Sequence, residues 1–113
     1  MKGKVSFEGI GEVAATFYAG EGVKAGQVVK VSGDSTVGPC ATGEDFCGVA
    51  GQVRDGCVGV QVEGFAQVSC SDSTVTVGRV ALVSDGNGGV KKGEGREYLV
   101  VTDDGAGTIT IKM

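Results

Sequence analysis

Two valine-rich stretches indicate the fold of this chain: QVVKV at 27–31, which is followed by SGD, and VGVQV at 58–62, which is followed by EG. β-Branched residues suit a pleated, half-buried strand, whereas Gly, Asp and Ser suit the turns between strands. Similar valine-rich runs recur along the 113 residues, which include 22 glycines and a single proline. The pattern predicts an all-β chain with many tight turns.

The valine-rich runs can be placed along the chain as short strands. Arg54-Asp55-Gly56 and Asp104-Gly105 each separate two such runs, and Asp-Gly supplies the positive φ that tight hairpins need. Residues 85–89 form a looser tip, and no window keeps a sustained helical period. Strands are therefore expected near residues 12–18, 27–31, 46–53, 57–62, 65–70, 79–84, 96–102 and 107–112.

Length and composition predict one small domain. The chain has four Phe, two Tyr and no Trp, so its core must be thin and made of Val, Ile, Leu, Ala and Cys. We expect a small β-barrel or β-tulip-like domain over residues 12–113. Residues 1–11 are polar and carry three glycines, and we expect a flexible N-terminal arm there.

Charge and hydropathy exclude several kinds of partner. The net charge is −4 and the ten Lys and Arg residues are scattered, which argues against nucleic acid. No apolar run approaches the roughly 20 residues that cross a bilayer, so no membrane partner is expected. Glu8 and Glu12 interrupt any hydrophobic signal core, which predicts synthesis in the cytoplasm.

The two halves of the chain also align with each other. Residues 23–32 match residues 75–84 through a V-x-x-G turn and a valine-rich strand, and residues 55–62 match 104–111 through Asp-Gly and a strand. Internal duplication would produce this pattern. Because any Gly- and Val-rich β chain aligns with itself to some degree, the sequence leaves both explanations open.

The four cysteines are the first candidates for chemistry. Cys40, Cys47, Cys57 and Cys70 contain no close C-x₂-C pair, and the chain has no His, so a zinc site is not expected. A catalytic thiol needs a basic neighbour, for which Arg54 near Cys57 is a poor substitute. We interpret all four as small buried hydrophobes in strands.

The acidic pairs Glu44-Asp45 and Asp103-Asp104 both lie near Gly, which favours solvated turns over a calcium or acid–base site. The loop at 85–89 lacks the alternating acids of a calcium loop, and no glycine fingerprint opens a helix. The sequence therefore predicts no catalytic, cofactor-binding or metal-binding residue, no cofactor, and a protein that is not an enzyme.

Taken together, several segments resemble the head-decoration, or capsid cement, proteins of tailed bacteriophages and prophages. The resemblance spans most of the chain and is carried by Gly/Val spacing at 9–18, GVKAGQVVKV at 22–31, FCGVA at 46–50, residues 58–68 and VGRVALV at 77–83. It implies a compact β domain that binds the outside of an assembled capsid shell, often as trimers, without catalytic residues.

On this resemblance we expect a virion protein on the capsid exterior, made in the host cytoplasm. Its expected partners are the major capsid protein lattice and copies of itself, as a trimer. Two other functions stay open. One is a small cytoplasmic binding or assembly module unrelated to capsids, such as a sugar- or peptide-binding domain, which should cluster its exposed aromatic residues. The other is an enzyme or redox protein that uses the cysteines.

Overall fold

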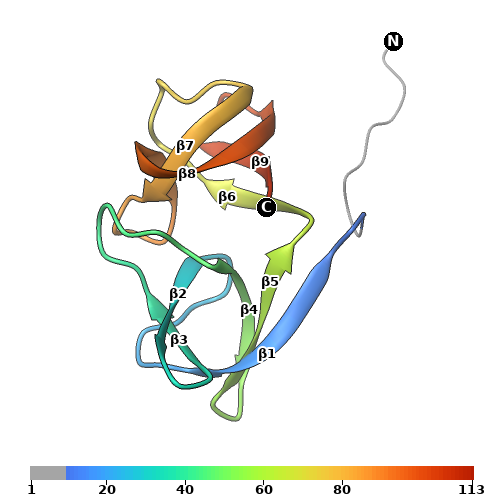
Figure 1. The fold of residues 1–113 in the computed structure, drawn as a ribbon, viewed down its shortest axis with the longest axis vertical. Helices are drawn as coiled ribbons and strands as arrows, with labels where there is room; N and C mark the ends of the chain where they lie inside the picture. Colours follow the sequence, from blue (N-terminus) through green and yellow to red (C-terminus); the bar gives the residue numbers. More distant parts are fainter. Residues whose placement is uncertain (1–9) are drawn as a thin grey trace.

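The computed structural model describes residues 10–113, and their regular structure is entirely β (Figure 1). The strands alternate with short turns along the whole described range. They are β1 (Val13–Ala19), β2 (Val28–Gly33), β3 (Thr36–Pro39), β4 (Gly48–Arg54), β5 (Cys57–Glu63), β6 (Phe65–Ser69), β7 (Gly78–Ser84), β8 (Val90–Asp103) and β9 (Thr108–Lys112).

The strands form two sheets, which Figure 1 shows as a barrel below and an open sheet above. The first sheet is a closed barrel with the order β1-β3-β2-β4-β5, in which β1 also pairs with β5. The second has four strands in the order β6-β9-β8-β7. All pairings are antiparallel except that of β1 with β3. The predicted all-β barrel is thus confirmed.

Each sheet contributes to its own hydrophobic cluster. The smaller cluster lies among the barrel strands and centres on Val29, Val37, Ala50, Val58 and Val60. The larger cluster includes the inner face of the open sheet, and Val28, Phe46 and Val49 of the barrel half pack into it. The larger cluster therefore joins the barrel half to the open sheet, whereas the smaller cluster belongs to the barrel alone.

The two halves of the chain have the same strand arrangement. In the first half, strands β1-β5-β4-β2 are neighbours in that order, and in the second half β6-β9-β8-β7 are neighbours in the corresponding order. A shift of 51 positions carries the pair Ala15–Val60 onto the pair Ala66–Ile111. The strand arrangement of the first half therefore recurs in the second at a shift of 51 positions, which differs from the shifts of 52 and 49 positions in the two sequence alignments, and β3 is the one strand that the described second half lacks.

Turn chemistry explains both predicted hairpins. Asp55 and Gly56 have φ values of 51° and 76°, so both occupy the left-handed region that a two-residue hairpin turn requires. In the β8–β9 connection, Gly105 and Gly107 have φ values of 71° and 98°. Both hairpins are confirmed.

The eight expected strands are present, with ends displaced by a few residues, and two features were missed. β3 was missed because a four-residue segment with Gly38 and Pro39 carries little strand signal. β8 begins at Val90, six residues earlier than expected, through the polar run KKGEG. There Gly93 and Gly95 lie against Val83 so closely that a Cβ would overlap its methyl groups. The strand therefore continues because these glycines admit Val83.

The expected arm at residues 1–11 lies mostly outside the described range. Residues 1–9 are not described, and Ile10 and Gly11 form an exposed turn before β1. Gly64 joins β5 to β6 with φ 97°, and a Cβ there would lie 2.8 Å from the Cα of Glu12. The beginning of β1 is thus held against the junction between the two sheets.

Candidate functional site

The most unusual surface is the two-stranded ribbon formed by β1 and β5. Four consecutive residues of β1, Val13 to Thr16, are exposed. Because successive side chains of a strand point to opposite faces, neither face of this part of β1 is covered by residues 10–113. Strands normally bury at least one face, so this segment has the properties of a surface that another chain covers.

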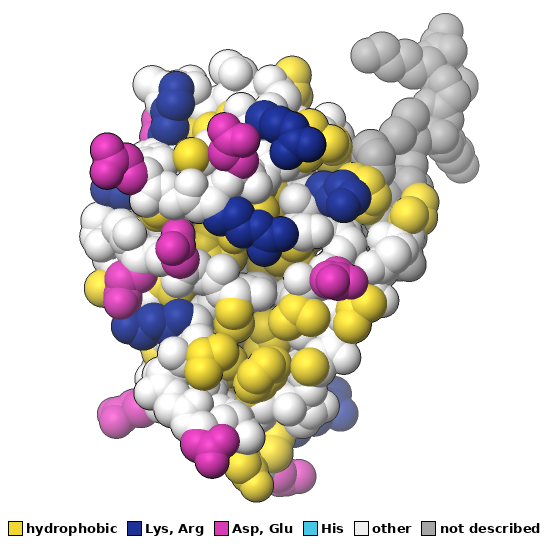
Figure 2. Space-filling model, in the orientation of Figure 1, with side chains coloured by type: hydrophobic (Ala, Val, Ile, Leu, Met, Phe, Trp, Pro, Cys, Tyr) yellow, Lys and Arg dark blue, Asp and Glu magenta, His cyan; other side chains and the backbone are white. Residues whose placement is uncertain are grey.

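The ribbon is also free of charge. Glu12 and Glu63 lie at one end of the β1–β5 pair and Arg54 and Asp55 at the other, with no charged residue of either strand between them. Figure 2 shows hydrophobic side chains gathered on the barrel half of the visible face, with charged side chains mostly around them. Depletion of charge at the centre of a patch is the compositional sign of a protein interface.

The surface of the ribbon also has small side chains. Gly59 of β5 is exposed, and a Cβ added there would meet no atom within 4 Å. Ala14, which lies on the same face as Gly59, presents only a methyl group, so a partner backbone could approach this face of the strands closely. Sequence reasoning missed this surface. Its signal was present, because VAAT lacks the alternation that a half-buried strand shows.

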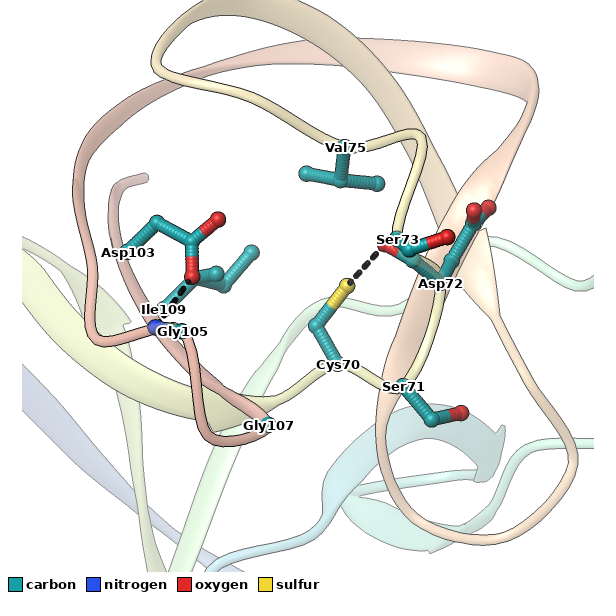
Figure 3. Close-up of a pocket in the computed structure, with 9 residues that line it drawn as sticks. All are labelled: Cys70, Ser71, Asp72, Ser73, Val75, Asp103, Gly105, Gly107 and Ile109. Carbon is teal, nitrogen blue, oxygen red and sulfur yellow. Dashed lines mark hydrogen bonds between the residues drawn. The ribbon is translucent and has the colours of Figure 1, made fainter.

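A second feature is a cavity of about 330 Å³ at the end of β6 (Figure 3). Apolar side chains of Cys70, Val75 and Ile109 line it, and Asp72 and Asp103 lie at its sides. The remaining lining residues are Ser71, Ser73, Gly105 and Gly107. The cavity is therefore a depression with a mixed lining, in which three apolar side chains lie among serines, glycines and two aspartates.

The acidic residues around this cavity serve mainly to hold turns. Asp72 Oδ1 accepts hydrogen bonds from the N–H and hydroxyl of Thr74, at 2.9 and 2.6 Å, and these bonds lower the pKa of the Asp72 carboxyl. Asp104 accepts the N–H groups of Ala106 and Thr108, which lowers its pKa too. Asp103 accepts the N–H of Gly105 at 2.9 Å. The expected solvated turn at Asp103-Asp104 is confirmed.

The other acidic pair also forms a turn but is not freely solvated. Both carboxylate oxygens of Glu44 lie 2.8 Å from Lys30 Nζ, and Glu44 also accepts the Ala41 N–H at 2.6 Å. The bond from Lys30, followed by that from Ala41, lowers the pKa of Glu44. Asp45 is exposed beside it. Glu44 thus fixes the connection between β3 and β4.

The cysteines are partly as expected. Cys40 and Cys70 are buried, whereas Cys47 and Cys57 are half-buried, and all four are free thiols. Burial raises the pKa of Cys40 to about 11 and also raises the pKa of Cys47 and Cys70. Only Cys57 lies in a strand, so the expectation that all four are buried within strands was wrong. Burial disfavours the thiolate that nucleophilic chemistry requires.

Within residues 10–113 there is no group of three or more Cys, Asp, Glu or His side chains placed to hold a metal ion. Asp85 of the 85–89 loop instead accepts the N–H groups of Asn87 and Gly89 at 2.7 and 3.1 Å. The Asp85 carboxylate is thus hydrogen-bonded by backbone N–H groups of its own loop.

The aromatic residues are divided between core and surface. Phe46 and Tyr98 are buried and stacked, with ring centroids 4.9 Å apart. Tyr18 is 62% exposed and lies on β1. The described surface thus offers this single large aromatic side chain rather than the cluster that a sugar-binding site would use.

The same part of the chain contains no helix able to cross a membrane. No protein-family model and no curated protein matches this chain.

Proposed function

We propose that this chain is a non-catalytic decoration protein of a tailed-phage or prophage capsid, which binds the outer capsid lattice and stabilises it. The observation that carries the proposal is the β1–β5 ribbon, in which Val13 to Thr16 of β1 are exposed on both faces and neither strand carries a charge between its ends. A surface of this kind costs solubility unless a partner covers it. The sequence resemblance to capsid decoration proteins supplies the identity of that partner.

The chemistry of the side chains agrees with a binding role. The thiols that burial affects have raised pKa values, and the acidic residues that form hydrogen bonds hold turns. A decoration protein needs a stable scaffold and an adhesive surface, and many weak contacts on a repeating lattice act together. The proposed place of action is therefore the capsid exterior, after synthesis in the host cytoplasm.

The test compares two exposed alanines on assembled capsids of the cognate virus. Ala15→Glu places a charge on the ribbon, whereas Ala106→Glu places the same charge in the β8–β9 connection. We expect Ala15→Glu to weaken capsid binding by about tenfold or more, since an unpaired charge in an interface costs at least about 1.4 kcal/mol. Ala106→Glu should bind like the unmodified protein. Co-sedimentation with capsids measures both.

The alternative is a small binding or assembly module unrelated to capsids, and the same ribbon would serve it. If the unmodified protein fails to bind such capsids while Ala15→Glu abolishes a contact with another cellular protein, that alternative replaces the capsid proposal. If both variants bind capsids as the unmodified protein does, the ribbon is not the contact surface.

A further inference from the structure

In the barrel half, the additional strand β3 lies beside β1, the first strand of that half. β3 lies along the free edge of β1, where the N–H groups of Tyr18 and Gly20 donate to the carbonyl oxygens of Ser35 and Val37, both at 2.8 Å. The N–H of Ala19 between them points the other way and donates to Gly56 O at 2.8 Å. One edge of β1 is thus paired with β5 and the β4–β5 turn, and the other with β3.

The second half repeats only one side of this arrangement. The N–H of Cys70 donates to Gly107 O at 2.8 Å, which is the Ala19–Gly56 bond displaced by 51 positions. Because N–H directions alternate along an extended chain, the N–H groups of Ser69 and Ser71 point away from β9. They correspond to Tyr18 and Gly20, and no strand among residues 10–113 lies along that edge.

The cavity at the end of β6 occupies the corresponding side-chain position. In the barrel, fully buried Val37 of β3 belongs to the same apolar cluster as Ala19, Val23 and Val58. At the shift of 51 positions, Ala19 and Val58 correspond to Cys70 and Ile109, and in the alignment of residues 23–32 with 75–84 Val23 corresponds to Val75. Cys70, Val75 and Ile109 all line the cavity (Figure 3). The second half therefore has the edge and the depression that receive β3 and Val37 in the first half, but not the strand.

We propose that the strand missing from this position is supplied by residues 1–9 of a second copy of the chain, which pairs with the edge at Ser69–Ser71 and places Val5 in the cavity. The sequence Lys4-Val5-Ser6 has a single valine as its apolar residue, as Thr36-Val37-Gly38 has in β3. The carboxylate of Asp103 lies beside the cavity and has the charge opposite to that of Lys2 and Lys4, whereas the carboxylate of Asp72 points away from the cavity and accepts the N–H groups of Thr74 and Lys92 (Figure 3). An added strand at a sheet edge is an established mode of recognition.

The direction in which the added strand must run favours a second copy, rather than the same chain, as the donor of that strand. Ile10 and Gly11 lie beside Gly64 and Phe65, where β6 begins. A segment that continued from Ile10 along β6 of its own chain would run antiparallel to β6. β3 runs parallel to β1, so the corresponding position requires a parallel strand. A segment donated by a neighbouring copy can meet this requirement.

The donated strand gives a head-to-tail contact, because each copy has one segment to give and one edge to receive it. Such heterologous contacts close into rings when the rotation between copies permits. The contact requires no capsid, so this inference goes beyond the proposed function. Self-association in free solution can succeed or fail whatever the result of capsid binding.

The first experiment is sedimentation velocity on the full chain at rising concentration. We expect concentration-dependent association that Ser71→Pro, which removes the edge N–H, weakens by about tenfold or more. Ser71→Ala, which keeps that N–H, should associate like the unmodified chain. Val5→Asp acts on the donor segment and should weaken association to a similar extent. It also keeps the test decisive if Ser71→Pro fails to fold.

The second experiment identifies the donor. Val5→Cys protein is prepared with and without ¹⁵N, mixed and oxidised, and mass spectrometry finds the partner of the introduced thiol. We expect a disulfide to Cys70 that joins labelled with unlabelled chains. Links confined to single chains would overturn the second-copy donor. A chain that stays monomeric up to about 1 mM, or association that neither Ser71→Pro nor Val5→Asp weakens, would overturn the proposal itself.

Discussion

The barrel half and the open-sheet half are built from the same arrangement of four strands, and they differ in one added strand. In the first half, β3 pairs with both β1 and β2 and closes the barrel. In the second half, a five-residue connection at 85–89 joins β7 directly to β8, and the sheet keeps two edges. The length of one connection therefore separates a closed barrel from an open sheet.

The difference shows that closure depends on a segment with little strand propensity of its own. β3 contains Gly38 and Pro39, and its position is fixed by its neighbours and by Val37 in the core. Tertiary packing here overrides local preference. The open half is completed on its inner face by Phe46 and Val49 from the barrel half rather than by a strand of its own.

The largest effect should come from blocking barrel closure at Gly48. A Cβ at this position would overlap the Gln61 carbonyl oxygen and a Val60 methyl group, so Gly48→Val should cost about 4 kcal/mol or more, or prevent folding. Gly59→Val is the control, because a Cβ there meets nothing within 4 Å. Chemical denaturation measures both. Equal stability of the two variants would show that the barrel is not packed as described.

The next effect concerns β3 itself. Val37 is fully buried, so Val37→Ala should lower the free energy of unfolding by about 2 kcal/mol through lost burial and a residual cavity. Val77, just before β7 in the open half, is 62% exposed, and Val77→Ala should change stability by less than about 0.5 kcal/mol. Urea titrations at constant pH compare the two. A loss at Val77 as large as that at Val37 would contradict the described burial.

Thiol reactivity should also differ between sites. Burial raises the pKa of Cys40 to about 11 from 9.0, so at pH 8 its thiolate population is about 100-fold lower than for an ordinary thiol. Cys57 is only half-buried and should react first with a disulfide reagent. Cys40 and Cys70 should react mainly after unfolding. Mass spectrometry of partly modified protein locates the labels, and early modification of Cys40 would contradict this order.

The smallest effect is the dependence of stability on pH. The pKa values of Asp72, Asp104 and Glu44 are lowered in the folded chain by the hydrogen bonds they accept. Their contribution is complete above their ordinary pKa values of 3.8 to 4.5 and is lost as the pH falls through the lower folded values. The chain has no His, so the melting temperature should be nearly constant from about pH 6 to 8 and fall below about pH 4.

Glu44→Gln supplies the control for the pH profile. It removes the ion pair with Lys30 and should make the fall at acidic pH shallower. A melting temperature that rises on acidification would reverse the assigned sign and contradict the account of these turns.

Much of the fold could be predicted from the sequence because the local signals agree with it. Valine-rich runs predicted the strands. The dipeptide Asp55-Gly56 predicted a hairpin because such a turn requires positive φ values, which both residues have in the structure. β3 and the first part of β8 could not be predicted, because their residues gain strand structure only from neighbours such as Val83. The missing alternation in VAAT was a signal for the ribbon, but the exposure of β1 on both faces and the cavity depend on where the rest of the chain packs, which the sequence does not give.

The comparison of the two halves is tested most directly by amide hydrogen exchange, measured by NMR at low and high protein concentration. At low concentration we expect the amides of Tyr18 and Gly20, which donate to β3, to be protected, and those of Ser69 and Ser71 to exchange quickly. The paired amides of Ala19 and Cys70 serve as internal references. At high concentration, Ser69 and Ser71 should become protected as a second copy adds its strand. Protection of Ser71 equal to that of Gly20 in the dilute monomer would contradict the account.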